Sequence, residues 1–502
     1  MVPSPMTRVS SNKNSTPDNP PANQLSNDEG EEQVASDDYS PALRRRNMRR
    51  TVSMANYEEI TGEEKRERLK QPDKPIHRHL DSLFSTSSGF TNYRGLLNLC
   101  ILLLVISNTR LVLENLIKYG ILIDPVASFQ MFLLNPYNWP NVVLLALLEL
   151  FILFAFKTEC LLAKNSISDK SGQLLYCINL LVLLIFPAAL ILHLHPNPAF
   201  SIVTLGFYTI VFLKLVSYCS VNSWCRNQVM RETPLKRHKS FSSSEGRKIP
   251  QSGKVGSQLV TYPNNLNLKD LHYFMFAPTL CYELNFPRSS RIRKSFLLKR
   301  FIEMIFLWQV MLALLQQWLE PIVRNSMKPL AEMDVKRSVE RLLKLAVPNH
   351  MIWLIFFYWF FHSCLNVVAE LLQFGDREFY HDWWNSETVS YFWKSWNIPV
   401  HRWASRHLYK PLVKRGHSKF TASCLVFLLS AFFHEYLVSV PLKMFRWWAF
   451  MGMCLQVPLA VIVDSRNYGK YGNMAVWLSL ILGQPIAILA YMHDYYILSK
   501  TE

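Results

Sequence analysis

The stretch QLLYCINLLVLLIFPAALILHLH, residues 173–195, decides the fold class. It is apolar almost without interruption over about the 20 residues that an α-helix needs to cross a bilayer. A strand in contact with lipid would leave backbone amides unpaired, and the strands of membrane barrels are shorter and alternate in polarity. The stretch therefore predicts a transmembrane helix and an all-α fold.

Comparable apolar runs recur along the chain, and together they predict a polytopic membrane protein with about nine spans. The other eight runs are residues 95–118, 140–156, 199–221, 295–320, 346–373, 420–442, 446–463 and 474–498. We expect one transmembrane domain over residues 95–498, preceded by a membrane-proximal segment, 76–94. Residues 1–75 hold few large apolar side chains, so we expect a disordered N-terminal region there.

The charge pattern indicates a topology rather than a nucleic-acid partner. The net charge is +17, but Lys and Arg fall between the apolar runs, as the positive-inside rule describes. The first residues, MVPSPMTRVSS, lack the apolar core of a secretory signal, so we expect a cytosolic N-terminus. A polar linker at 231–257 and a basic loop at 374–419 are then cytosolic. Charge alone does not explain the basic loop expected at 321–345, which falls on the lumenal side.

Two ionisable side chains, His434 and Glu435, lie within the apolar run 420–442. Such residues are costly in lipid and normally mark a cavity or a pathway. Ser430 shares a helical face with His434, so we expect the imidazole to face the protein interior. Glu435 projects about 100° away and is better suited to orienting or supporting its neighbours. The alternative is that His434 only hydrogen-bonds to an adjacent helix.

Aromatic residues are dense in the loop 374–419, first in FYHDWWN at 379–385 and then in WKSWNIPVH at 393–401. The ordinary explanation is a belt at the membrane interface. The loop continues through basic and aromatic residues, among them Arg402, Arg406 and Tyr409. By charge and by stacking, this surface is also suited to a phosphorylated, adenine-bearing carrier.

These motifs resemble the membrane-bound O-acyltransferase family. FYHDWWN is similar to the FYxDWWN motif of its diacylglycerol and sterol branch, and SAFFHEYLVSVPL at 430–442 resembles the segment with the family's catalytic histidine. VNSWCR at 221–226, APTLCYELNFPRS at 277–289 and RLLKLAVPNH at 341–350 extend the resemblance. It implies spans around a reaction chamber, in the endoplasmic reticulum membrane, and a homodimer or homotetramer. It also implies acyl-CoA as co-substrate, with no cofactor, no metal and no nucleic-acid partner.

The resemblance also implies the roles of individual residues. His434 would be the general base, taking a proton from the acceptor hydroxyl in a chamber that excludes water. Asn397 would be the second catalytic residue. The residues expected to contact acyl-CoA or acceptor are Phe379, Tyr380, Asp382, Trp383, Trp384, Asn385, Trp393, Trp396, Ile398, Pro399, Val400, His401, Tyr409, Glu435 and Gln484.

The expected reaction is the esterification of diacylglycerol to triacylglycerol, and two alternatives remain open. Sterol O-acylation is the nearer one, because both branches share FYxDWWN. The segments NIPVH at 397–401 and FFHE at 432–435 favour the diacylglycerol branch. The other alternative is a lipid transporter or channel without catalytic activity, in which His434 and Glu435 would line a path.

Overall fold

The computed structural model describes residues 94–124, 126, 139–240, 259–331, 335–465 and 469–501. The chain divides into two compact units, Met1–Leu99 and Cys100–Glu502. Of the first unit, only the opening turns of helix α2 belong to the described residues. The disordered region expected at 1–75 lies outside them, as does nearly all of the membrane-proximal segment 76–94. The account below concerns the second unit.

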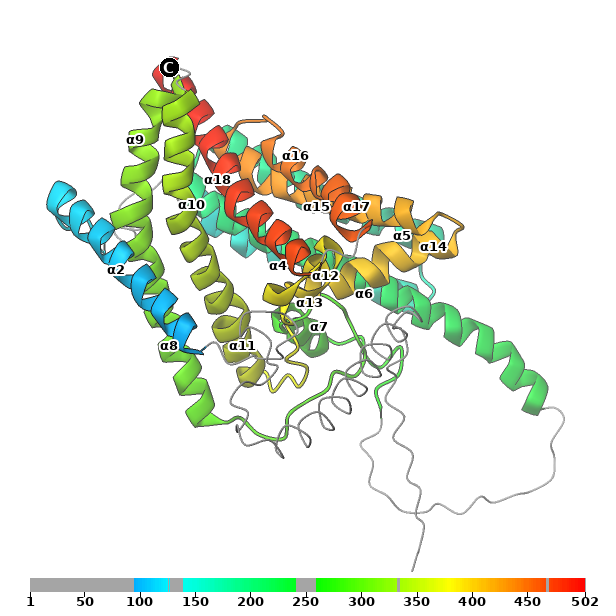
Figure 1. Cartoon of the computed structure of the whole chain (residues 1–502). Coiled ribbons are helices and arrows are strands. Elements are labelled where there is room, and N and C mark those ends of the chain that lie inside the picture. The colour runs from blue at the N-terminus through cyan, green and yellow to red at the C-terminus, as the bar shows by residue number, and fades with distance from the viewer. Residues whose placement is uncertain are drawn as a thin grey trace, which may run out of the picture. The chain divides into compact units, whose positions relative to one another are not determined.

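The described chain is helical throughout, apart from connecting segments and one isolated bridge between Arg288 and Phe374 (Figure 1). The first helices are α2 (Arg94–Tyr119), α4 (Trp139–Ala163), α5 (Asp169–Leu194), α6 (Pro198–Ser240), α7 (Leu268–Phe276), α8 (Lys294–Leu314), η2 (Leu315–Leu319), α9 (Glu320–Ala331), α10 (Val335–Phe357), η3 (Tyr358–Cys364) and α11 (Leu365–Leu371). They are followed by η4 (Trp383–Asn385), α12 (Val389–Ser395), α13 (Ile398–Ala404), η5 (Ser405–Tyr409), α14 (Lys410–Lys414), α15 (Lys419–Leu442), α16 (Trp448–Cys454), α17 (Gln456–Ser465) and α18 (Lys470–Thr501). The predicted all-α fold is confirmed.

Seven helical stretches in the described chain are long and apolar enough to cross a membrane. They are Trp139–Ala163, Asp169–Leu194, Pro198–Arg231, Val335–Leu371, Lys419–Leu442, Trp448–Ser465 and Tyr471–Tyr495. The two other expected spans coincide with α2 and with α8 and η2, which are helical but are not among the seven. A multi-pass membrane protein is thus established, whereas a total of nine spans stays a prediction.

Two expected connections are helical instead. The basic residues of the supposed loop at 321–345 lie on α9 and α10, which pack against each other and against α18 through Val323, Met327, Leu345 and Leu489. Basic residues alternate with acidic ones at helical spacing here, so the charges form pairs on one helix, such as Glu340 with Lys344 at 2.5 Å. Helix α6 likewise continues through the first part of the expected linker 231–257, and residues 241–257 lie outside the described chain.

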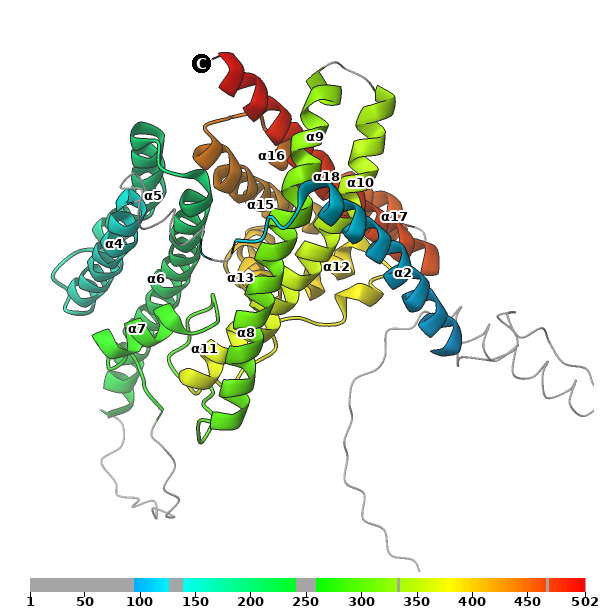
Figure 2. The ribbon, with the colours of Figure 1, turned by 90° about the vertical axis from the view of Figure 1, so that its left-hand side faces the viewer.

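Helices α4, α5 and α6 pack on one another and stand together in Figure 2. A buried carboxylate, Glu159, joins them. It accepts hydrogen bonds from Tyr176 of α5 at 2.5 Å and Tyr262 at 2.9 Å, and it is paired with Arg226 of α6. Burying a charge costs free energy unless it is paired and hydrogen-bonded, and here both conditions are met. This group of helices is therefore held by a fully satisfied polar cluster.

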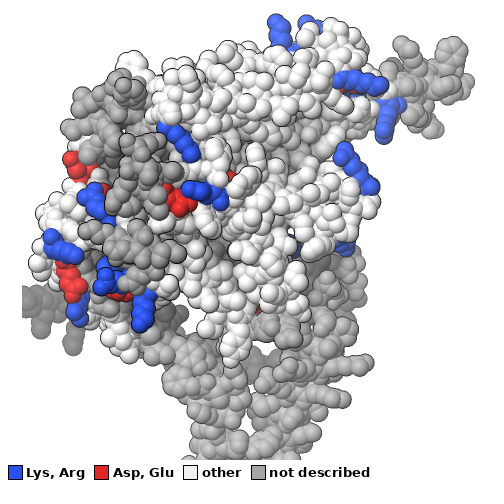
Figure 3. Space-filling model, turned by 90° about the horizontal axis from the view of Figure 1, so that it is seen from above, with Lys and Arg blue, Asp and Glu red and all other residues white. Residues whose placement is uncertain are grey.

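A second core is aromatic and lies where α10, η3, α12 and α18 meet the loop that carries FYHDWWN. Its buried rings include Phe357, Phe361, Phe379, Trp383 and Phe392. Within this core the helix that begins at Val335 widens into the π-helical stretch η3. Such widenings are uncommon and occur frequently at functional sites. From above, Lys and Arg side chains are scattered over the visible face, and acidic ones lie beside several of them on one side (Figure 3).

Candidate functional site

His434 lies in the second half of α15, a helix that Ser418 caps by accepting a hydrogen bond from the Thr421 amide. The imidazole Nδ1 is 2.7 Å from the carbonyl oxygen of Ser430, one turn earlier. A carbonyl oxygen only accepts, so Nδ1 must carry the hydrogen. In the neutral ring, Nε2 then holds a free lone pair. The hydrogen bond to the backbone of α15 therefore leaves Nε2 of His434 as the proton acceptor.

The imidazole also has open space beside it. His434 has a large accessible surface, although its side chain lies deep among protein atoms. Its chain neighbours Phe433 and Glu435 are both buried. The ring therefore combines accessible surface with close protein surroundings. His434 thus meets the geometric requirement for a base that acts on a bound substrate.

Glu435 points the other way and is held by donors from two other helices. Its carboxylate accepts from the backbone amides of Trp447 and Phe450, each at 3.0 Å, and from the Tyr491 hydroxyl at 2.8 Å. Ser439 also donates to it. An acidic group at the first turn of α16 is favourable, because unpaired amides and the helix dipole meet there. Glu435 therefore holds the turn of α15 that carries His434 against α16 and α18. Its contact with substrate stays a prediction.

Helix α18 connects this turn with the aromatic core. Trp477, Gln484 and Tyr491 are spaced seven residues apart, so they lie on one face of α18, about 10 Å from one to the next. Tyr491 binds the neighbour of His434, whereas Trp477 lies 5.7 Å from the ring of Trp383. Half-buried Gln484 lies between these two contacts, and its Oε1 accepts from Asn349 of α10 at 3.2 Å.

Asn397 is the N-cap of α13. Its Oδ1 accepts from the amide of Val400 at 3.2 Å, and Pro399 occupies the first turn, where no amide hydrogen is needed. With the oxygen engaged in the cap, the amide NH2 is the end that can donate to a ligand. No hydrogen bond joins Asn397 to His434 among the described side chains.

The segment before Asn397 contacts α15. The rings of Trp393 and Phe427 lie 5.7 Å apart, and Phe427 is on the same face of α15 as His434, two turns earlier. Trp396 packs against Phe361 at 5.8 Å. The loop that carries Asn397 thus adjoins the face of α15 that carries His434, although no contact joins the two predicted catalytic side chains directly.

The FYHDWWN motif builds the frame around this region. Phe379 and Trp383 are buried in the aromatic core, and the Tyr380 hydroxyl lies 2.8 Å from Nδ1 of His362. Asp382 accepts from Tyr391 at 2.5 Å and from Asn385 at 3.3 Å, and these hydrogen bonds lower the pKa of Asp382. The carbonyl of Trp384 accepts from the Trp477 indole at 3.3 Å. The motif thus makes many contacts within the protein.

The other predicted contact residues are spread over α13 and η5. Ile398 is buried, Val400 is exposed, and Pro399, His401 and Tyr409 are half-buried. Burial lowers the pKa of His401. These residues differ in accessibility, and their contact with substrate stays a prediction.

Sequence reasoning passed over His407 in η5. The Ser217 hydroxyl lies 2.8 Å from its Nε2, and the Trp224 ring stacks on it at 5.6 Å. Because Ser217 accepts from the Tyr282 amide at 2.8 Å, its own hydrogen is free to be donated to the imidazole. Burial, followed by the charge of Arg406, lowers the pKa of His407 to about 4. The signal in the sequence was Trp224 within VNSWCR, and a tryptophan in a motif does not identify the residue on which it stacks.

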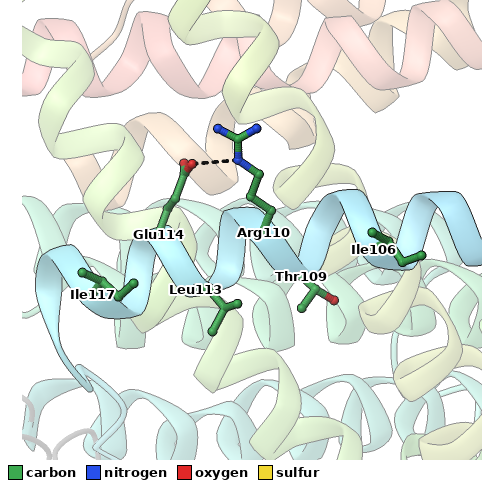
Figure 4. A pocket seen from close by; sticks show the side chains of 6 residues that line it. All are labelled: Ile106, Thr109, Arg110, Leu113, Glu114 and Ile117. Carbon is green, nitrogen blue, oxygen red and sulfur yellow. Dashed lines mark hydrogen bonds and ion pairs between the residues drawn. The ribbon is translucent and has the colours of Figure 1, made fainter.

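One surface depression lies elsewhere, on α2. Figure 4 shows the six residues that line it, all from this single helix: Ile106, Thr109, Arg110, Leu113, Glu114 and Ile117. Its two charged groups, Arg110 and Glu114, bind each other at 3.0 Å. A site for chemistry normally brings polar groups together from several elements. This depression therefore carries no catalytic assignment.

Comparison with known proteins identifies the fold just described. The model of MBOAT, the membrane-bound O-acyltransferase family, matches residues 161–493, which include all of α15 and the loop that carries Asn397. The chain belongs to this family. As a family member it is an acyltransferase, and His434 lies within the matched region.

The acyltransferase has close relatives among characterised proteins. It is 57% identical over 429 residues to diacylglycerol O-acyltransferase 1 of Bos taurus, covering 85% of this chain and 86% of that protein. It is 58% identical over 424 residues to diacylglycerol O-acyltransferase 1 of Homo sapiens, covering 84% of each chain. Diacylglycerol O-acyltransferase 1C of Glycine max is 40% identical over 432 residues, covering 84% of this chain and 80% of that protein.

Proposed function

We propose that this protein transfers an acyl chain from acyl-CoA to the hydroxyl of diacylglycerol, producing triacylglycerol and free CoA. The proposal is supported by the geometry of His434, whose Nδ1 is engaged by the Ser430 carbonyl and whose ring has accessible surface on α15, a helix apolar enough to cross a membrane. The names of the close relatives support the choice of diacylglycerol as acceptor.

The chemistry needs a base because an alcohol hydroxyl is a poor nucleophile. Nε2 of His434 accepts the hydroxyl proton while the oxygen attacks the thioester carbonyl. The carbon–sulfur bond then breaks, and the imidazolium returns the proton to the departing thiolate, so that histidine ends the cycle neutral. In this proposal the NH2 of Asn397 donates to the thioester oxygen as negative charge develops on it. An enclosed chamber also keeps water from hydrolysing the acyl donor.

The remaining parts of the proposal concern binding and location. The basic and aromatic surface of α13, η5 and α14 is suited to the phosphorylated, adenine-bearing end of acyl-CoA. Arg402 is already engaged by Asp376 at 2.5 Å and by Glu378, so its neighbours Lys410, Lys414 and Arg415 are the better candidates for phosphate contact. We further propose residence in the endoplasmic reticulum membrane, a cytosolic N-terminus, and a homodimer or homotetramer.

The test is an acceptor assay on the purified full-length protein in detergent micelles. Labelled oleoyl-CoA is supplied with diacylglycerol or with sterol, and the products are separated. We expect labelled triacylglycerol, and preferential formation of sterol ester would overturn the choice of acceptor. A transporter would consume no acyl-CoA at all, so the absence of any acyl transfer would overturn the catalytic proposal.

A further inference from the structure

The carboxylate of Asp464, near the end of α17, accepts two hydrogen bonds from the backbone of another helix. Its Oδ1 lies 2.9 Å from the amide nitrogen of Val389, and its Oδ2 lies 3.2 Å from that of Ser390. These amides open α12, where a helix offers them no carbonyl of its own. The next amide, that of Tyr391, donates to the Thr388 hydroxyl at 3.1 Å. Two of the first three amides of α12 are therefore bound by a side chain of α17.

Helix α18 binds the residues that lead into α12. The side-chain NH2 of Asn473 donates to the carbonyl oxygen of Trp384 at 3.1 Å and to that of Ser386 at 2.8 Å. The backbone of Gly472 approaches so closely that a Cβ at this position would overlap the carbonyl oxygen of Glu387. A residue with a side chain would push this part of the chain away, so the close approach depends on glycine.

The residues 384–390, here called the clamped segment, are thus held from two sides. Donors on α18 bind its carbonyls and an acceptor on α17 binds its amides, and α12 packs against both helices. Asp464 is half-buried, and no ion pair joins it to a Lys or Arg within the described ranges. Both of its oxygens are instead spent on backbone amides. The carboxylate therefore serves the placement of α12.

The far end of α12 leads directly to Asn397. The helix ends at Ser395, whose carbonyl accepts from the amide of His381 at 2.8 Å. Just beyond Asn397, the amide of Ile398 donates to the carbonyl of Phe379 at 3.0 Å. A short hydrogen-bonded helix in a close-packed interior moves as a unit, so a shift at its beginning is passed on to its end. The placement of Asn397 consequently depends on how the clamped segment is held.

We infer that Asp464 is a positioning residue for Asn397 and acts through α12. This inference rests on the proposed function, in which the NH2 of Asn397 donates to the thioester oxygen. Such a donor must lie about 2.7–3.1 Å from the developing oxyanion. A misplacement of about 1 Å can lower turnover about 100-fold, so two backbone bonds at the start of α12 are enough to affect the reaction.

The experiment uses the purified full-length protein in detergent micelles, with labelled oleoyl-CoA and dioleoylglycerol. Asp464→Ala removes both acceptors, and we expect kcat to fall about tenfold. KM for dioleoylglycerol should stay near that of the unaltered protein, because the loss concerns the reacting carbonyl. Asp464→Asn has the same size and keeps one acceptor oxygen, so its kcat should lie between the two. The matched control is Ser168→Ala, which removes the N-cap of α5 and should lower the melting temperature without changing kcat.

A double-mutant cycle with Asn397→Ala separates positioning from general loosening of the fold. If Asp464 acts through Asn397, adding Asp464→Ala to Asn397→Ala should cause no further loss of kcat. The same tenfold loss in both backgrounds, an equal loss in Ser168→Ala, or full turnover in folded Asp464→Ala would each overturn the inference. A fully active Asn397→Ala would overturn it together with the role of that asparagine. The absence of acyl transfer by the unaltered protein would instead overturn the proposed function itself.

Discussion

Two sets of polar groups in this protein differ in how completely they are paired, namely the cluster around Glu159 and the histidines of α10 and α15. In the α4–α6 group, Glu159 is fully buried and has a tyrosine, a second tyrosine and an arginine as partners. Around α10, α15 and α18, by contrast, His434 keeps a free Nε2 and His350 has neither nitrogen paired within the described chain. The first arrangement stabilises the helix packing, and the second leaves hydrogen-bonding capacity for a ligand.

The contrast shows how to distinguish structural from functional polar residues in a membrane protein. Intramembrane charge alone does not make the distinction, because both regions contain it. What differs is the number of protein partners. Glu435 illustrates the point within a single turn of helix, since it has four protein donors and lies next to His434, whose Nε2 has none among the described residues. The predictions below test this distinction.

The largest expected effect is on activity, from His434→Ala. Removing the base should lower kcat about 100-fold to 10,000-fold, the range that general acid–base catalysis contributes. Because the imidazole makes one hydrogen bond, to its own helix, the thermal unfolding temperature in detergent should change little. The measurements are triacylglycerol formation and a melting curve on the same preparation. Retained turnover in a folded variant would contradict the role of His434.

The largest expected effect on stability is from Glu159→Gln. This change removes one of the two carboxylates paired with buried Arg226, the other being Asp169 at 3.1 Å. Removing one partner of a buried pair costs up to about 3–5 kcal/mol. Activity per folded molecule should stay near that of the unaltered protein. The matched control is Glu320→Gln, which breaks the exposed pair with Arg324 and should cost about 0–1 kcal/mol. Equal melting temperatures for the two variants would show that the cluster is not structural.

Asn397→Asp should separate capping from catalysis. Aspartate accepts from the Val400 amide as well as asparagine does, so α13 and the melting temperature should be preserved. The NH2 donor is lost and a negative charge is added, and we expect kcat to fall about 100-fold, as for removal of one donor to an oxyanion. Asn397→Ser provides the comparison, because it keeps the cap without the charge. A fully active Asn397→Asp variant would remove this residue from the mechanism.

The smallest expected effect concerns pH and His407. Its folded-state pKa of about 4 lies below the ordinary 6.5, so the folded state favours the neutral ring. His407 therefore does not change the free energy of unfolding above pH 6.5. It lowers this free energy as the pH falls from 6.5 toward 4, because the unfolded chain binds the proton more readily than the folded one. His407→Phe should make the melting temperature vary less with pH between 6.5 and 4. An unchanged curve would show that other groups determine the acid sensitivity.

Much of the fold was predictable because long apolar runs leave a membrane chain few alternatives to helix. The position of His434 on a long apolar helix was predictable too, since an ionisable residue in such a run is conspicuous, whereas its catalytic role stays a prediction. The bond between Asn349 and Gln484 was not predictable, because it joins α10 to α18 and spacing along one helix does not reveal it. The helices at 321–345 were missed because basic residues suggested a loop, although their acidic partners recur at helical spacing.

The bond between Nδ1 of His434 and the carbonyl of Ser430 lies within one turn of one helix. The direction in which the free lone pair of Nε2 points is therefore set by α15 alone and does not depend on how neighbouring helices are arranged. In the proposed reaction, water-insoluble substrates and products would pass this ring in every cycle. Small movements of the neighbouring helices would leave the bond to Ser430 intact, so the free lone pair of Nε2 would keep its direction from one turnover to the next.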